Sequence, residues 1–315
     1  MSGGPLSTPF FGRTAIHLDK TKTRAPHLVS KTHAFGRQWL KTAALTPLLI
    51  LSVVVHGTTA LAALCAAASG ALIAEAAGAW IFRRKINYHD GESVFLGLFC
   101  AVILPWTLSV WFFFAAALIT VFWGREIFGG FGQSIVFPPA VGLLVLFMGF
   151  APMIQAFDFK SARSLDWAAN EAGHGALDFW SLLFYPSSAS AEDLSFLALA
   201  AGAVLLILLR WVSWTLPLLG FLGYAAGCFL LKEKLVWLSG GFWLTLFFGL
   251  SQTSALPLKT SSRWVYAACA GFFSAVCPLS DPALCSLSGL GLASLLVPWI
   301  ELAGSVRLET NREAS

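Results

Sequence analysis

The sequence predicts an all-α integral membrane protein whose helices cross the bilayer about ten times. Hydrophobic residues occupy 57% of the 315 positions and charged residues only 11%, a balance that leaves too little polar surface for a water-soluble globule. The hydrophobic residues form runs of roughly 20 positions, the length that a helix needs to cross a bilayer. Basic residues concentrate near the start of the chain and in short loops, and this bias orients the helices.

The first half of the predicted membrane domain contains five spans. The domain covers residues 42–306 and follows a basic cytoplasmic leader, residues 1–41, in which we expect no signal peptide. Arg83-Arg84-Lys85 ends the second span and places that end in the cytoplasm, in agreement with the basic leader. The five spans are expected at residues 42–55, 58–82, 93–104, 106–124 and 136–154.

The second half also contains five predicted spans. A long polar segment, residues 155–193, precedes it and is extracytoplasmic by parity, in agreement with its acidic character. The spans are expected at residues 194–209, 214–231, 235–250, 264–276 and 283–300, and a cytoplasmic tail, residues 307–315, ends the chain. Five spans on each side of one outer loop would form two inverted halves with both termini in the cytoplasm, a pattern known from transport folds.

A glycine-rich segment between the fourth and fifth predicted spans is the most unusual stretch. Gly129, Gly130 and Gly132 lie within four residues, and Pro138-Pro139 follows. Glycine permits close approach of the backbone to a ligand or another helix, and proline interrupts a helix. Such a segment at membrane depth must be buried in protein or line a cavity. It is therefore either a tight interhelical turn or a broken helix that forms a cofactor pocket.

Glu75 is the clearest ionisable residue inside a predicted span. A carboxylate in the middle of a membrane costs several kcal/mol unless it is paired or neutral. Arg83 lies about two helical turns away, too far for a direct ion pair, so a partner would have to come from another helix. Glu75 is a candidate for an ion pathway, and a structural interhelical hydrogen bond is the alternative.

Other kinds of chemistry leave no pattern in the sequence. The six cysteines form no CxxC pair and have no histidine at metal-ligand spacing, so we expect neither a metal site nor a disulfide framework. No nucleophile accompanies a base, and the glycine-rich segment matches neither a phosphate loop nor a dinucleotide fingerprint. We expect no catalytic residue in this chain.

Five short motifs follow one another along the chain. They are Ala25-Pro26-His27-Leu28, Asp90-Gly91-Glu92-Ser93 with Leu104-Pro105, the run from Gly129 to Gly142, Leu238-Ser239-Gly240-Gly241, and Val297-Pro298-Trp299-Ile300-Glu301. In order and spacing they resemble the APH, DGS…LP, GGLGxNxFNPAxxG, LSGG and PxID-like motifs of one membrane-protein family, RnfD/NqrB. That family comprises the D subunit of Rnf-type electron-transport complexes and the B subunit of the sodium-translocating NADH:quinone reductase.

The resemblance implies a function for the chain as part of a complex. It would be a membrane subunit that supports electron transfer across the bacterial cytoplasmic (inner) membrane, coupled to Na⁺ or H⁺ movement, rather than an enzyme by itself. Its partners would be other membrane subunits and an extracytoplasmic FMN-binding protein, with no nucleic acid. A transporter-like or scaffold paralogue without redox activity is the alternative. Residues that would contact a noncovalent flavin (FMN or riboflavin) are Gly129, Gly130, Gly132, Gln133, Ser134, Pro138, Gly240 and Gly241.

The chain also departs from the family. Ser134 and Phe137 stand where the glycine-rich motif has two asparagines, and the segment from Gly249 to Ser254 lacks the aspartate of the family's MATDPVTSP. The family's SGAT-type threonine, which carries FMN through a phosphoester, has no equivalent in the outer loop, so we expect no covalent FMN. His174 in that loop is either a replacement ligand or a solvated side chain. The resemblance then implies that a second flavin-bearing protein, docked outside, takes over this step.

Overall fold

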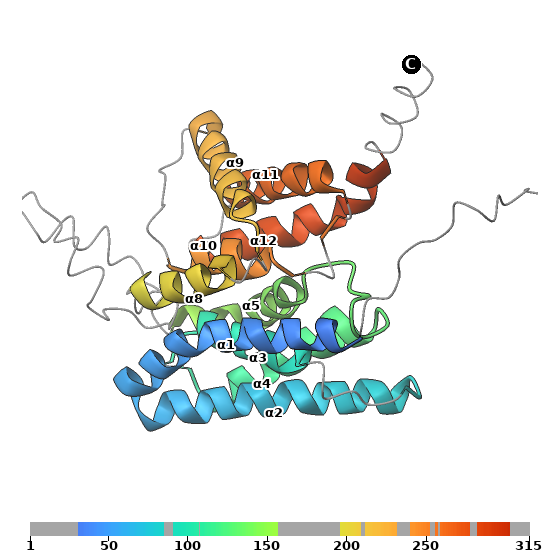
Figure 1. Cartoon of the computed structure of the whole chain (residues 1–315). Helices are drawn as coiled ribbons and strands as arrows, with labels where there is room; N and C mark the ends of the chain where they lie inside the picture. The colour runs from blue at the N-terminus through green and yellow to red at the C-terminus, as the bar shows by residue number, and fades with distance from the viewer. Residues whose placement is uncertain are drawn as a thin grey trace, which may run out of the picture.

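The computed structural model describes residues 31–84, 91–106, 108–156, 196–208, 212–231, 240–252, 256–257, 259–277 and 282–302. All regular secondary structure in these residues is helical, which confirms the predicted all-α class (Figure 1). Two helical stretches, Gln38–His56 and Thr58–Ile81, are long and apolar enough to cross a membrane, and the other apolar helices are shorter. The number of spans and the side on which the termini lie stay predictions.

The first helix group contains six elements. They are α1 (Lys31–His56), α2 (Thr58–Ile81), α3 (Glu92–Ile103), α4 (Val110–Val121), the π-helix η2 (Phe122–Glu126) that continues it, and α5 (Pro138–Ala156). The predicted break at Gly57 between the first two helices is confirmed. Residues 31–41, expected in the leader, are instead the first part of α1, and Gln38 and Lys41 are only 1% and 3% exposed. Two polar side chains that are almost fully buried indicate a polar region inside the bundle.

The second helix group also contains six elements. It consists of α8 (Phe196–Leu208), α9 (Thr215–Leu231), α10 (Gly240–Leu244), the π-helix η4 (Thr245–Gly249) and α11 (Thr260–Val276), followed by α12 (Pro282–Leu295). Of the predicted outer loop, residues 155–193, the part after Ala156 lies outside the described residues, and His174 lies in that part. Residues 1–30 of the leader and the tail 307–315 also lie outside them.

The two groups pack in equivalent ways. In the first group α4 packs on α2 and α5 packs on α4; in the second α11 packs on α9 and α12 packs on α11. The groups meet through like elements, α1 against α8 and α5 against α12. Each group also contains one π-helix, which follows the fourth helix in the first group and the third helix in the second. This repetition supports the predicted division into two halves.

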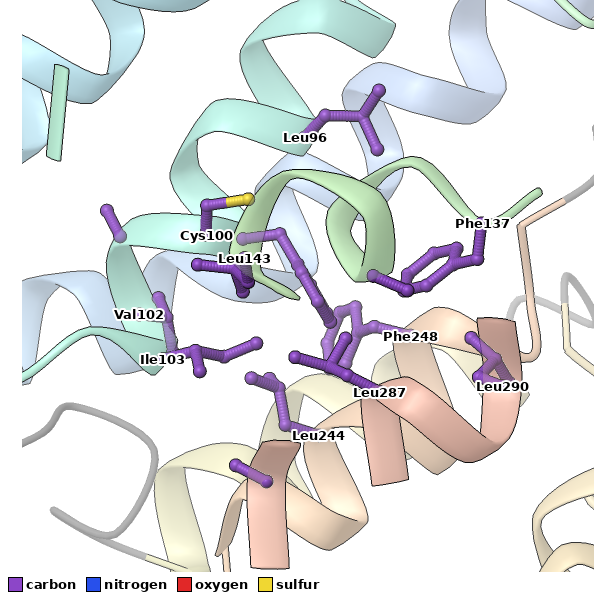
Figure 2. Packing of buried hydrophobic residues seen from close by; sticks show 14 of the residues in the cluster. Leu96, Cys100, Val102, Ile103, Phe137, Leu143, Leu244, Phe248, Leu287 and Leu290 are labelled. Carbon is purple, nitrogen blue, oxygen red and sulfur yellow. The ribbon is translucent and has the colours of Figure 1, made fainter. Parts of the chain in front are cut away.

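A continuous apolar core joins the halves. Leu143 and Phe137 from the first half lie beside Leu244, Phe248 and Leu287 from the second (Figure 2). Within the core the rings of Phe99 and Phe137 meet edge to face with centroids 5.7 Å apart. Because apolar residues of both halves share one core, the halves pack as one body.

The outer surface carries large apolar side chains. Trp80, Met148 and Phe229 are 82%, 83% and 85% exposed. Inside, α2 packs through small residues, and its buried positions include Ala60, Ala63, Ala67, Ala71 and Ala74. Small residues between helices and large apolar residues outside are typical of helices that pack in lipid.

Candidate functional site

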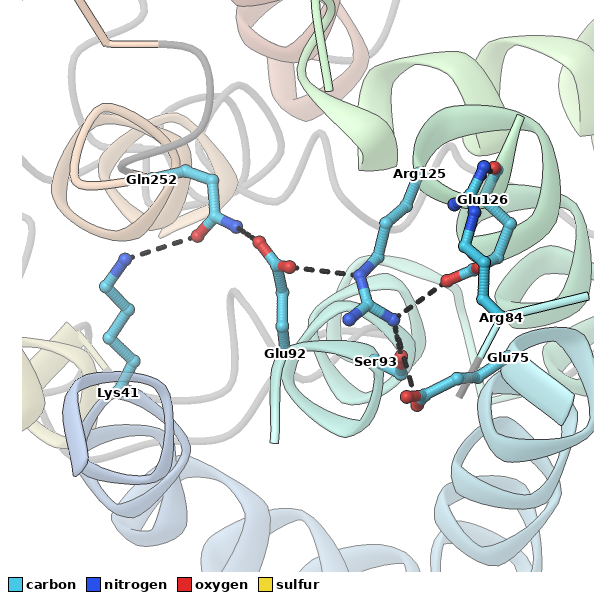
Figure 3. A network of polar contacts seen from close by, with 8 residues as sticks. All are labelled: Lys41, Glu75, Arg84, Glu92, Ser93, Arg125, Glu126 and Gln252. Atoms are coloured by element: carbon cyan, nitrogen blue, oxygen red, sulfur yellow. Dashed lines mark hydrogen bonds and ion pairs between the residues drawn. The ribbon is translucent and has the colours of Figure 1, made fainter. Parts of the chain in front are cut away.

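Charged and amide side chains from both halves meet in a buried polar network (Figure 3). Its members are Lys41 of α1, Glu75 of α2, Glu92 and Ser93 of α3, Arg125 and Glu126 of η2, and Gln252 just after η4. Each is between 1% and 5% exposed. Since a buried charge is costly unless it is paired and hydrogen-bonded, this concentration of ionisable groups is the candidate functional site.

Arg125 lies at the centre of the network. Its Nε donates to Glu92 Oε2 at 3.0 Å, and its Nη1 donates to Glu126 Oε1 at 3.1 Å and to the Ser93 hydroxyl. Glu75 Oε2 is 3.7 Å from the same Nη1. The planar guanidinium presents several N–H donors at fixed angles, so one arginine can hold carboxylates from three helical elements.

Glu92 connects Arg125 with the second half. Gln252 Nε2 donates to Glu92 Oε1 at 2.6 Å, and Lys41 Nζ in turn donates to Gln252 Oε1 at 3.2 Å and to the Ser251 backbone carbonyl at 2.9 Å. The contacts thus run from Lys41 through Gln252 and Glu92 to Arg125. This path is a buried polar connection between the halves.

Two π-helical turns position the network residues. In η2 the Ile127 N–H donates to the Phe122 carbonyl at 3.1 Å, and in η4 the Leu250 N–H donates to the Thr245 carbonyl at 3.2 Å. A π-turn is wider than an α-helical turn and occurs frequently at functional sites. The first turn holds Arg125, and the second precedes Ser251 and Gln252, which contact Lys41 and Glu92.

A glycine on α2 makes room for η2. A Cβ added at Gly78 would lie 2.5 Å from Glu126 Cγ, which is closer than non-bonded carbon atoms approach. Glu126 therefore packs directly against the α2 backbone beside Glu75. Any side chain at position 78 would displace it.

The prediction that Glu75 needs a partner from another helix agrees with the structure, where that partner is Arg125 of η2. The sequence did not indicate Lys41, Glu92, Arg125 or Gln252 as site residues. Lys41 lies at the predicted boundary between leader and first span, and the others lie near helix ends, where a polar residue is ordinarily solvated. Only the packing of distant segments places them inside the bundle.

The glycine-rich loop adjoins η2. Gly129, Gly130 and Gly132 have φ angles of 129°, 90° and 74°, which side-chain-bearing residues rarely adopt. The Gly130 N–H donates to the Arg125 carbonyl at 3.1 Å, and the Gln133 N–H donates to the Gly130 carbonyl at 3.2 Å. These bonds form a tight turn after η2, with Gly132 and Gln133 exposed.

The two positions at which the family has asparagine contribute no amide. Ser134 is 3% exposed, and Phe137 is fully buried with its ring against Phe99. Pro138 begins α5, and the Phe137 N–H donates to Ser294 Oγ of α12 at 3.3 Å. Since a core phenyl ring offers no polar contact, these positions do not fit a flavin held through amide side chains.

The remaining predicted cofactor residues lie elsewhere. Gly240 and Gly241 are buried at the start of α10. The helical segment formed by α10 and η4 runs from Gly240 to Gly249, roughly 13 Å at 1.5 Å per residue, so these glycines lie at its opposite end from Gln252. No cluster of three or more histidine, cysteine, aspartate or glutamate side chains among the described residues could hold a metal ion.

Comparisons with known proteins agree with the motifs. The chain is 27% identical over 285 residues to the D subunit of the ion-translocating oxidoreductase complex of Methanosarcina acetivorans, covering 90% of this chain and 94% of that protein. It is 25% identical to the D subunit of the Na⁺-translocating ferredoxin:NAD⁺ oxidoreductase complex of Acetobacterium woodii, covering 90% and 93%. The match to the B subunit of the Na⁺-translocating NADH-quinone reductase of Pseudoalteromonas atlantica is 25% identical and covers 64% and 55%. Residues 21–296 match the family model of the NQR2, RnfD, RnfE family, and the chain belongs to this family.

Proposed function

We propose that this chain is the membrane subunit of an Rnf/Nqr-like complex that supports electron transfer across the membrane coupled to ion movement. The observation that carries the proposal is the match to two D subunits over 90% of this chain and 94% and 93% of theirs. The chain acts as one subunit of an ion-translocating oxidoreductase rather than as an enzyme by itself, and other membrane subunits of the complex are its partners.

The buried network is the part of the chain that we assign to ion coupling. Ionisable side chains inside a membrane domain commonly mark ion and proton pathways. Arg125 holds Glu75, Glu92 and Glu126 together, so a change in protonation or occupancy at one carboxylate alters the partners left for the others. Because Glu92 also binds Gln252, such a change reaches the second half. Glu75 belongs to this pathway.

Flavins held by partner proteins carry the electrons in this proposal. Residues 136–213 contain no threonine to which FMN could be esterified. An extracytoplasmic FMN-binding protein then accepts or delivers electrons in place of an outer loop that carries its own flavin. A flavin bound to the chain itself would be noncovalent FMN or riboflavin. Because Phe137 offers no amide, such a flavin would need polar contacts from other residues.

The membrane placement follows from the charge pattern. The chain crosses the bacterial cytoplasmic membrane about ten times with both termini in the cytoplasm, and its halves are inverted with respect to each other. Arg83 and Arg84 at the end of α2 support this orientation. Labelling of an Arg83→Cys variant with a thiol reagent from either side of the membrane tests this orientation. Labelling only from the extracytoplasmic side would contradict it.

The experiment that tests the function is purification of the intact complex from native membranes through a tag on this chain. We expect flavin-bearing partners in the preparation, a visible flavin spectrum, and an intact mass for this chain of 33.8 kDa without an FMN increment. Reduction of the flavins by a low-potential donor should generate an ion gradient in reconstituted vesicles. A preparation without any flavin would favour the transporter-like or scaffold paralogue.

A further inference from the structure

The Lys41 ammonium lies at the end of a broken helix of the second half. Lys41 is 3% exposed, and its Nζ is 2.9 Å from the Ser251 backbone carbonyl and 3.2 Å from Gln252 Oε1. The two residues lie two and three positions after Gly249, the last residue of the π-helical turn η4. A side chain from the first half therefore delivers a positive charge to the C-terminal end of a short helix in the second half (Figure 3).

The end of η4 has the properties of a cation site. The last carbonyls of a helix lack intrahelical donors, and the helix dipole makes that end negative. In transport folds, carbonyls at the ends of broken helices coordinate monovalent cations near the middle of the membrane. Here the Ser251 carbonyl and Gln252 Oε1 converge on one point, and Gln252 is bound on its other side to the Glu92 carboxylate.

A further buried amide oxygen lies one turn away on α1. Gln38 is 1% exposed, and its Oε1 accepts no hydrogen bond within the part of the chain that the structure describes. Residues three apart in a helix share one face, so Gln38 lies one turn before Lys41 on the same side of α1. Backbone carbonyl and amide oxygens are the kind of ligand that hard cations prefer.

We propose that Lys41 is a tethered cation: its ammonium fills a monovalent-cation site formed by Ser251 and Gln252, so that free Na⁺ does not bind there in this chain. An ammonium and a sodium ion carry the same single positive charge, and both bind carbonyl and amide oxygens. Two of the relatives are named for Na⁺ translocation. The inference rests on the proposed function only in its consequence, that the ion moved by the complex is not a Na⁺ bound at this position.

The test is the Na⁺ dependence of thermal unfolding of the full chain in lipid nanodiscs. Its intrinsic tryptophan fluorescence reports unfolding, and NaCl is compared with choline chloride at equal ionic strength. We expect the native chain to unfold at the same temperature in both salts. Lys41→Ala, which removes the ammonium but keeps the oxygens, should gain a Na⁺-specific rise of about 2 °C at tenfold excess over its dissociation constant.

Two matched variants separate the tethered charge from a general loss of charge. Lys41→Arg keeps a cation on α1 and should show no Na⁺-specific rise. Lys259→Ala removes a half-buried lysine before α11 and should also show none. Adding Gln252→Ala to Lys41→Ala removes one of the two oxygens and should abolish the gained response.

Two results would overturn the proposal: a Na⁺-specific rise in the native chain, or its absence in a folded Lys41→Ala variant. If that variant does not fold, Lys41→Gln, which also removes the ammonium, takes its place and should show the Na⁺-specific rise. A native chain that Na⁺ stabilises would contradict a filled site in either case. The measurement needs no electron transfer. A failure of the tethered-cation inference is therefore distinct from a failure of the proposed redox function, which the flavin content of the complex decides.

Discussion

At the scale of single residues, the network depends on one guanidinium. Arg125 contacts carboxylates from α2, α3 and its own turn, and all of them are almost completely buried. Removing one partner of a buried ion pair costs more than the pair contributes, because it leaves an uncompensated charge in a low-dielectric interior. Arg125 should therefore tolerate substitution less well than any exposed arginine of the chain.

We expect Arg125→Leu to lower the free energy of unfolding by about 3–5 kcal/mol. Arg125→Lys should recover part of this loss, because an ammonium keeps the charge but cannot reproduce the planar fork of donors. The unfolding midpoint in detergent measures both effects. Arg83→Leu, at an exposed position at the end of α2, is the control and should change little. Equal losses for the two leucine variants would mean that Arg125 does not hold the network.

The hydrogen bond between Glu92 and Gln252 can be tested by exchanging the two groups. Gln252→Glu alone places two carboxylates at a contact that is now 2.6 Å, and should destabilise the bundle. Adding Glu92→Gln restores one amide and one carboxylate, although Arg125 then loses a partner. A double-mutant cycle on unfolding should give a coupling energy of about 0.5–3 kcal/mol. Additive effects of the two substitutions would show that they do not interact.

From the sequence one can predict that a buried polar site is needed, but not which residues form it. Glu75 can be recognised because a carboxylate inside an apolar span requires a partner. That the partner is Arg125 cannot be predicted, since it depends on how α2 packs against η2. Lys41 falls in the predicted solvated leader for a similar reason, because its acceptors lie 210 and 211 positions away in the chain. Sequence patterns report local burial, whereas the choice of partner is a property of the packed bundle.

At the scale of elements, the site depends on close contact between α2 and η2. Gly78→Ala would place a Cβ 2.5 Å from Glu126 Cγ, so η2 must shift or Glu126 must leave its position. We expect a loss of about 1–3 kcal/mol in the free energy of unfolding. Gly149→Ala on α5 is the matched control, because a Cβ there meets no atom within 4 Å. Equal effects would show that helix propensity, not the contact, governs both substitutions.

The glycine-rich loop illustrates a limit of motif reading. The spacing of Gly129, Gly130 and Gly132 matches the family and predicts an unusual backbone, and all three have positive φ angles. Whether the loop holds a ligand depends on neighbouring side chains. Phe137 fills one expected amide position from within the core, against Phe99. A backbone motif and its ligand contacts are thus separate properties, and at position 137 the amide expected from the motif is absent.

At the scale of the whole molecule, the two halves are held together by one apolar core and by polar contacts that cross between them. Phe248 of η4 is 1% exposed and belongs to the core shared with the first half (Figure 2). Lys41, Gln252 and Glu92 form the charged part of these polar contacts. Because both cross between the halves, the halves should recognise each other even without a covalent link.

We therefore predict that the chain can be divided between α5 and α8 and reassembled by co-expression. A tag on the first half should recover the second half from detergent extracts, since helices that are stable in lipid associate through packing.

Phe248→Ala removes a buried ring that faces the other half and should reduce the recovery strongly. Phe229→Ala removes a ring that is 85% exposed and should leave the recovery unchanged. Lys41→Ala should weaken recovery less than Phe248→Ala, because it removes hydrogen bonds while the apolar core stays intact. If Phe229→Ala and Phe248→Ala reduce recovery equally, the halves are held together by something other than the packing described here.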